Sequence, residues 1–353
     1  MSDVLDRAAG CLVGLAYGDA LGVPYEAGVR PLDGTPHLLG GGLGNYEPGE
    51  WSDDTQMAIC IAQAALDVGP ADLPTEVGLD AVAERFEDWY AGRPADIGIQ
   101  TARVLRDAEL LTGGPAARLR AAAHALHERS GRTAGNGALM RTAPVAVALH
   151  GNAGAIASTA RAVAELTHPD PLAGDSCVLW CLAIDEALRG GPVDPAAHLE
   201  ALPAQRRDQW AAWIAEADGA PPSMFADNGF TVTALQAAWA GISYPPESDP
   251  GSPHSLRFGG NPGSERTFGA SARRPAGSSR ERSSLPRASY LRMIHAAISA
   301  GGDTDTVAAI AGALAGAGWG LAALRDDRID RVHGWPDLTI DDLAELGRQL
   351  VRI

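Results

Sequence analysis

The stretch Ala300-Gly301-Gly302-Asp303-Thr304-Asp305-Thr306-Val307-Ala308 joins a tight turn to the start of a helix. The two glycines allow the backbone to turn sharply, and the Ala-rich run that continues to Ala317 has the composition of a helix. The carboxylates of Asp303 and Asp305 therefore belong to a helix start. Asp and Thr are common capping residues there, so a well-capped helix without further function is one interpretation of this stretch.

A second polar cluster, Trp51-Ser52-Asp53-Asp54-Thr55, opens another apolar helical run that extends to Leu66. Both clusters offer carboxylates beside hydroxyls, which are the oxygen ligands that hard divalent cations prefer. Capping needs only one such residue at each helix start. If the two clusters converge, two divalent ions would balance the repulsion among four carboxylates, those of Asp53, Asp54, Asp303 and Asp305.

Further motifs accompany these clusters in a fixed order. Any one of them could occur by chance, but together they are a strong signal: the Gly-Asp…Gly…Glu segment within 10–26, Ser52-Asp53-Asp54-Thr55, Asp96-Ile97-Gly98, Gly135-Asn136-Gly137-Ala138-Leu139-Met140-Arg141, Thr167-His168, Gly302-Asp303-Thr304-Asp305-Thr306 and His333-Gly334-Trp335-Pro336. With these motifs the chain resembles the ADP-ribosylglycohydrolase family. That family includes the dinitrogenase reductase-activating glycohydrolases and the ADP-ribosyl-arginine and ADP-ribosyl-serine hydrolases.

The resemblance implies a hydrolase that cleaves the C1″ glycosidic bond of ADP-ribosyl groups, most often on protein side chains. It implies two Mg²⁺ or Mn²⁺ ions, which would orient the ribose and lower the pKa of an attacking water, and an oxocarbenium-like transition state is expected for such a cleavage. The implied metal ligands are Ser52, Asp53, Asp54, Asp303, Asp305 and Thr306. Spacing leaves open which carboxylate activates the water, the catalytic candidates being Glu26, Asp54, Asp96 and Asp303.

Two of these acids have more specific expected roles. Glu26 matches a family glutamate near the metals and is expected to act as an acid or base, or as an additional ligand. Asp96 is expected to orient or protonate the leaving guanidine if ADP-ribose is linked to arginine, although a helix cap is the alternative reading of this residue. The Asp-Ile-Gly motif that contains Asp96 favours the arginine linkage.

Three further segments are candidates for substrate binding. Glycines before an apolar helix leave backbone N–H groups free for a phosphate, and the resemblance assigns the diphosphate of ADP-ribose to Gly135, Asn136 and Gly137. A simple turn is the alternative there. His168 is either a helix-end dipole partner or, by resemblance, a ligand contact. Phe230 is either a core residue or part of the adenine-side wall.

The same residues are also compatible with other substrates, or with ligand binding without catalysis. The same enzyme class acts on serine-linked ADP-ribose, O-acetyl-ADP-ribose and poly-ADP-ribose. A non-catalytic ADP-ribose-binding relative is a second alternative, but retention of both acidic clusters argues against it. An unrelated phosphohydrolase with paired aspartates is a third.

Composition excludes several function classes. The chain has 353 residues and a net charge of −16, whereas nucleic-acid and anionic-membrane partners call for a basic face. Its 28 basic residues are all arginine, so a Schiff-base lysine mechanism is excluded. The N-terminal residues do not have a signal-peptide pattern. We therefore expect a cytoplasmic monomer whose partner is an ADP-ribosylated protein or another ADP-ribose conjugate.

The predicted fold is all-α, a single compact multi-helix domain of the ADP-ribosylglycohydrolase type that spans 1–353. Apolar residues recur at helical spacing through most of the chain, and no strand-like alternation is present. The predicted helices include 4–20, 138–149 and 198–217. The segment 245–289 is rich in Pro, Ser, Gly and Arg and is predicted to be a flexible insertion; a recognition arm whose arginines meet phosphate is the alternative.

Overall fold

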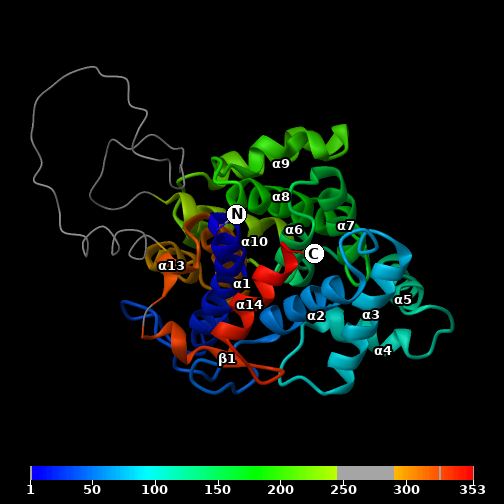
Figure 1. Ribbon diagram of the computed structural model, residues 1–353, viewed down its shortest axis with the longest axis horizontal. Helices are drawn as coiled ribbons and strands as arrows, with labels where there is room; N and C mark the ends of the chain where they lie inside the picture. The colour runs from blue at the N-terminus through cyan, green and yellow to red at the C-terminus, as the bar shows by residue number, and fades with distance from the viewer. Residues whose placement is uncertain (1, 245–289, 326, 353) are drawn as a thin grey trace, which may run out of the picture.

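The computed structural model describes residues 2–244, 290–325 and 327–352, and the predicted insertion at 245–289 lies outside them. The described chain is helical apart from loops and one short hairpin (Figure 1). The all-α prediction is therefore confirmed. None of the described helices combines the length and the apolar composition that a membrane span requires.

The elements follow in this order: α1 (Ser2–Gly22), η1 (Val23–Gly28), α2 (Asp53–Val68), α3 (Glu76–Ala91), α4 (Ile99–Ala108), α5 (Pro115–Ser130), η2 (Asn136–Ala138), α6 (Ala143–Ala148), α7 (Ala153–Glu165), α8 (Pro171–Leu188), η3 (Pro195–Ala201), α9 (Ala204–Ala217), η4 (Pro222–Phe225), α10 (Thr231–Ser243), α12 (Thr304–Trp319), α13 (Leu321–Leu324), η5 (Ile329–Arg331), β1 (His333–Gly334), β2 (Leu338–Thr339) and α14 (Ile340–Leu350). The η elements are short 3₁₀ helices. Residues 290–298, before α12, are also helical.

Helices α1 and α12 form the centre of the fold. Four glycines of α1 recur at every fourth position and so lie on one face. A Cβ built on any of them would overlap backbone atoms of α12 or of the residues just after it. Gly312 and Gly316 of α12 would overlap α1 in the same way. The two backbones are therefore in direct contact, which brings the C-terminal end of α1 to the N-terminal end of α12. The four glycines of α1 are Gly10, Gly14, Gly18 and Gly22.

The remaining helices pack in two groups around this pair. In Figure 1, α2 to α5 gather on one side, while α7, α8 and α9 lie on another, with α6 and α10 between. Helix α8 is buried along almost its whole length and packs against α7, α6 and α12. All four cysteines are buried and free, as residues of the core.

Two predicted helices differ from the observed ones. The predicted helix 138–149 is a turn of η2 followed by the short α6, because Pro144 stands in the first turn of α6. The predicted helix 198–217 is divided into η3 and α9. Proline at 203 disfavours helical backbone at the preceding residue, and Leu202 is extended.

The hairpin β1–β2 was not predicted. Its strands have two residues each and pair His333 with Thr339, so they are too short to produce an alternating pattern. Their function is local: His333 O accepts a hydrogen bond from Trp51 N, and Trp335 O accepts one from Trp51 Nε1. The hairpin thus fixes the residue that precedes Ser52.

The α1–α12 contact makes a prediction about stability. Gly14→Ala should lower the melting temperature, because overpacking at a backbone contact costs about 1–3 kcal/mol or more, although alanine is the better helix former. Gly154→Ala, at an exposed position in the first turn of α7 where an added Cβ would meet only Asn152 Oδ1 at an ordinary contact distance of 3.8 Å, is the matched control and should leave the melting temperature unchanged or raised. Thermal unfolding followed by circular dichroism measures both. Equal melting temperatures for the two variants would show that α1 and α12 have room to separate.

Candidate metal and ligand site

Asp19, near the C-terminal end of α1, connects that helix to the N-terminus of α2. Its carboxylate accepts hydrogen bonds from the backbone and hydroxyl groups of Ser52 and Thr55. The residue is completely buried, and burial raises the pKa of Asp19 to about 6 although these hydrogen bonds lower it. Sequence reasoning placed Asp19 in a motif but did not include it among the site residues. Its position in the Gly-Asp pair was the available signal.

The acidic residues at the two helix starts do not serve as caps. Ser52 is the N-cap residue of α2 and Asp303 that of α12, and neither side chain makes a capping hydrogen bond. Ser52 Oγ instead lies 2.8 Å from both Asp19 Oδ1 and Asp54 Oδ2. A hydroxyl has one hydrogen and can donate to only one carboxylate at a time. The capping interpretation therefore does not account for these side chains.

Two carboxylate clusters meet at Asp305. Asp19, Asp54 and Asp305 each have one oxygen within 4.8 Å of the others, and so do Glu26, Asp303 and Asp305. Asp54 Oδ1 and Asp305 Oδ1 are buried and have no hydrogen-bond partner among the residues that the structure describes. A buried carboxylate oxygen without a partner is costly, and a cation would satisfy it. An oxygen-only donor set fits Mg²⁺ or Mn²⁺ better than softer metals.

The same crowding shifts the ionisation of these acids. Burial, followed by the charges of neighbouring aspartates, raises the pKa values of Asp53, Asp54 and Asp305 well above their usual range. Burial, then the charges of Asp303 and Asp96, raises the pKa of Glu26 to about 7. A raised pKa favours the protonated, neutral form of each carboxyl group, and a bound cation would reverse that preference.

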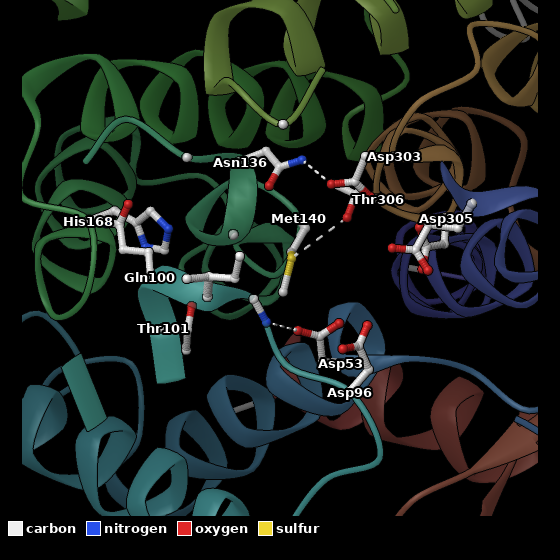
Figure 2. Close-up of a pocket in the computed structure, with 16 residues that line it drawn as sticks. Asp53, Asp96, Gln100, Thr101, Asn136, Met140, His168, Asp303, Asp305 and Thr306 are labelled. Carbon is white, nitrogen blue, oxygen red and sulfur yellow. Dashed lines mark hydrogen bonds between the residues drawn. The ribbon is translucent and has the colours of Figure 1, made fainter. Parts of the chain in front are cut away.

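A cavity of about 320 Å³ opens next to these clusters. Asp53 and Asp96 lie side by side on one wall, and Asp303, Asp305 and Thr306 lie at one end (Figure 2). Asp53 Oδ2 accepts a hydrogen bond from Gly98 N at 3.3 Å, which ties the Asp96-Ile97-Gly98 turn to the start of α2. Ser52 and Asp54 lie behind this wall and do not line the cavity.

The predicted ligand loop is joined directly to the acidic end. Asn136 Nδ2 donates to Asp303 Oδ2 at 2.7 Å and to Asn228 O at 2.9 Å. Asn228 Oδ1 accepts from Asp303 N at 2.8 Å, and its Nδ2 donates to Gly301 O. Asn228 thus holds the turn before α12 in place. Sequence reasoning did not assign Asn228, because a single asparagine beside a glycine is typical of any turn.

The end of the cavity opposite Asp303 and Asp305 is formed by His168 together with Gln100, Thr101, Gly135 and Gly137 (Figure 2). His168 is buried, and its Nδ1 lies 2.7 Å from Thr167 Oγ1, so the residue does not cap its helix. Gln100 Nε2 donates to Thr133 O and Thr167 O. Gln100, Thr101 and Met140 also line the cavity. None of them was assigned to the site from the sequence, although Met140 stands in the motif that begins at Gly135.

Phe230 differs from the other predicted ligand contacts. It is the N-cap residue of α10, its side chain is 37% exposed, and its backbone pairs with Gly135. The neighbouring Gly229 lines the cavity, whereas Phe230 does not. The structure therefore brings Glu26, Asp53, Asp96, Asp303, Asp305 and Thr306 together with Gly135, Asn136, Gly137 and His168, with Phe230 beside them.

The chain is similar to proteins of known families. Residues 1–352 match the family described as ADP-ribosylglycohydrolase. The ADP-ribosylarginine hydrolase Tri1 of Serratia proteamaculans is 34% identical over 41% of this chain and 37% of its own length. The ADP-ribosyl-[dinitrogen reductase] glycohydrolase of Rhodospirillum rubrum is 31% identical over 50% of this chain and 55% of its own length. The first match thus covers less than half of the relative's own length, and the second covers little more than half.

Two comparisons extend over most of the chain. The ADP-ribosylhydrolase ARH3 of Danio rerio is 28% identical over 91% of this chain and 85% of its own length. A solved structure titled "ADP-ribosylglycohydrolase-related protein complex" has a TM-score of 0.66 and 24% sequence identity, and covers 100% of this chain and 99% of that one. At this identity, the likeness to the solved structure concerns the fold alone. From the family match along nearly its whole length, the chain belongs to the ADP-ribosylglycohydrolase family.

Proposed function

We propose that this protein is a metal-dependent hydrolase that cleaves the glycosidic bond between ADP-ribose and an acceptor. One observation carries the proposal: a cavity has the Glu26, Asp303 and Asp305 cluster at one end, joined through Asp305 to the buried Asp19 and Asp54, and the loop of Gly135 to Gly137 with His168 at the other. The first end suits hard cations and a polarised water, and the second suits a phosphate and a polar ligand group. The family membership and the names of the relatives support the same chemistry.

Two divalent ions, Mg²⁺ or Mn²⁺, are the proposed cofactors. Their ligands would come from Ser52, Asp53, Asp54, Asp303, Asp305 and Thr306, with Asp19 as a further buried carboxylate in the first cluster. When bound, such ions supply a Lewis acid and a water of lowered pKa. The unpartnered oxygens of Asp54 and Asp305 are the observation that supports cation binding.

The remaining roles, which are proton transfer, activation of the water and positioning, are assigned to side chains of this protein. Glu26 lies within the Glu26, Asp303 and Asp305 cluster, where a carboxylate reaches a water or the ribose, so we assign it proton transfer or metal ligation. Asp54 and Asp303 are the other candidates for activating the water. The hydrogen bond from Asn136 to Asp303 fixes the spacing between the ligand loop and the acidic cluster before substrate binds.

Protein-linked mono-ADP-ribose on arginine is the favoured substrate. Asp96 lines the cavity beside Asp53, and a carboxylate pairs well with a guanidinium through charge-assisted hydrogen bonds. Serine-linked ADP-ribose is the second candidate, because the family that the chain resembles includes ADP-ribosyl-serine hydrolases. Hydrolysis of O-acetyl- or poly-ADP-ribose and non-catalytic binding remain alternatives. We further propose that a single domain spanning 1–353 acts as a monomer.

The substrate class can be tested by ADP-ribose release. With Mg²⁺ present, we expect the protein to release ADP-ribose from arginine-linked conjugates faster than from serine-linked peptides, and chelation with EDTA should stop both reactions. Chromatography of free ADP-ribose measures the rates. Faster release from serine-linked peptides would transfer the assignment to the second candidate, and release from neither would contradict the proposed function.

Asp305→Asn should remove metal binding while the fold remains. We expect release of ADP-ribose to fall below about a tenth of the wild-type rate, because catalytic metals supply several kcal/mol. The melting temperature of the wild type should be higher in Mg²⁺ than in EDTA. At a Mg²⁺ concentration a hundredfold above Kd, binding to the folded state adds about 2.7 kcal/mol to the free energy of unfolding. The variant should lose this response, and should be no less stable in EDTA because one repelling charge is gone.

The control for this variant is Asp208→Asn, which removes an exposed carboxylate on α9. It should keep the wild-type rate and the wild-type response to Mg²⁺. An Asp305→Asn protein that still responds to Mg²⁺ as the wild type does would remove Asp305 from the ligand set.

Asp96→Asn tests the assignment to the leaving group. If Asp96 protonates the guanidine, release from arginine conjugates should fall by about 10²–10⁴-fold, with the response of the melting temperature to Mg²⁺ retained. Rates measured in parallel on serine-linked peptides provide the internal comparison. An equal loss on both linkages would indicate a role in the metal cluster.

A further inference from the structure

Arg141 is a completely buried cation whose recorded partners among the described residues are uncharged. Its Nη1 donates to Met57 Sδ at 3.2 Å, its Nη2 donates to Thr167 Oγ1 at 2.6 Å, and its guanidinium lies 4.5 Å from the centre of the Phe86 ring. Its Nε has no partner. Burial lowers the pKa of Arg141 to about 10, so the side chain is still charged at neutral pH. Among the described residues no carboxylate is in hydrogen-bond contact with the guanidinium, although the charge of Asp53 acts on it. A buried charge without a contacting counterion is costly, which calls for a functional reason.

Thr167 connects Arg141 to the cavity. Its side chain is fully buried, and its Oγ1 lies between Arg141 Nη2 and His168 Nδ1, the latter at 2.7 Å. A guanidinium can only donate hydrogen bonds, so Thr167 Oγ1 accepts from Arg141. The hydroxyl hydrogen of Thr167 is then directed at the remaining recorded partner, His168 Nδ1.

This arrangement selects one tautomer of His168. If Nδ1 carried the proton, Thr167 Oγ1 would accept from both neighbours, and its own hydrogen would be buried without a recorded acceptor, at the cost of a lost hydrogen bond. If Nδ1 accepts from Thr167, the Thr167 hydroxyl both accepts from Arg141 and donates to His168, and neither its oxygen nor its hydrogen lacks a partner. Burial and the charge of Arg141 lower the pKa of His168 well below its usual range. The imidazole is therefore neutral, and its single proton is on Nε2.

The Nε2 atom faces the ligand loop. A Cβ built on Gly137 would lie 3.2 Å from His168 Nε2, and one built on Gly135 would lie 3.3 Å from it. The two glycines therefore leave this nitrogen accessible to a ligand in the cavity. Figure 2 shows His168 across the cavity from Asp303 and Asp305.

We propose that Arg141 is a positioning residue that acts through Thr167 to hold His168 as the Nε2–H tautomer. The end of the cavity opposite the acidic clusters then presents a fixed hydrogen-bond donor to an acceptor atom of the ligand, such as a ring nitrogen, a ribose oxygen or a phosphate oxygen. Only the identity of that ligand, ADP-ribose or its conjugate, rests on the proposed function.

Nuclear magnetic resonance of the full chain labelled with ¹⁵N-histidine tests the proposal without turnover. Two-bond proton–nitrogen correlation spectra report which ring nitrogen carries the proton, and a His168→Gln variant identifies the His168 signals. We expect the wild type to show a neutral ring protonated at Nε2. A ring protonated at Nδ1, or at both nitrogens, overturns the proposal.

Variants of Thr167 test the connection. Thr167→Val keeps the shape and removes the hydroxyl, so His168 should become a mixture of tautomers and the affinity for ADP-ribose, measured by calorimetry, should fall about three- to tenfold. Thr167→Ser keeps the hydroxyl and should restore both readouts. Thr159→Val, which removes another buried hydroxyl, one without a partner, should change neither.

Variants of Arg141 test the origin of the arrangement. Arg141→Met should shift His168 away from the single tautomer, while Arg141→Lys, which keeps a charged donor, should preserve it at least in part. If Arg141→Met does not fold, the wild-type spectrum and the comparison of Thr167→Val with Thr167→Ser test the proposal instead. An unchanged tautomer and affinity in Thr167→Val also overturn the proposal. A wild type with the expected tautomer that releases no ADP-ribose from any conjugate would contradict the proposed function and leave this inference standing.

Discussion

The direct contact between the backbones of α1 and α12 is the constraint on which the acidic site depends. Side chains between two helices can adjust by changing rotamer, whereas a glycine-to-glycine contact has no such freedom. It places Gly22 against the backbone of Asp305 and Thr304, and hydrogen bonds to Asp19 join the same end of α1 to the start of α2. Three separate helix ends, those of α1, α2 and α12, therefore meet at one point. The carboxylate clusters are a consequence of that meeting.

The chemistry of the site was easier to predict than the contact that builds it. The short motifs that contain Asp53, Asp54, Asp303 and Asp305 indicate cation binding by their residue types alone. In the structure Asp53, Asp303 and Asp305 line the cavity, and Asp54 belongs to the cluster with Asp19 and Asp305. The glycines at 10–22 were interpreted as part of a glycine-rich entry segment. Glycine lowers helix propensity, and the partners Gly312 and Gly316 lie about 300 residues away in the sequence, so local patterns could not show the packing.

The polar residues that align the two ends of the cavity were also beyond sequence reasoning. Asn228 and Gln100 act by hydrogen bonds to backbone groups of distant segments: Asn228 to Asp303 and Gly301, and Gln100 to Thr133 and Thr167. Such contacts depend on tertiary structure, because an isolated amide side chain has no preferred partner. Asp19 is intermediate, since its motif was visible but its four hydrogen bonds to Ser52 and Thr55 were not.

Both ends of the cavity hold charge away from water, and each does so by a different means. At the acidic end, carboxylates are crowded together, and Asp54 and Asp305 each have a buried oxygen without a partner among the described residues, an arrangement that a bound cation would stabilise. At the other end, Arg141 is buried with neutral partners, and its charge orders the hydrogen bonds around it. The first arrangement is suited to capturing cations, and the second to presenting a donor of fixed direction. Under the proposed function, a ligand that spans the cavity would offer oxygens to the metal ions at one end and a hydrogen-bond acceptor to His168 at the other.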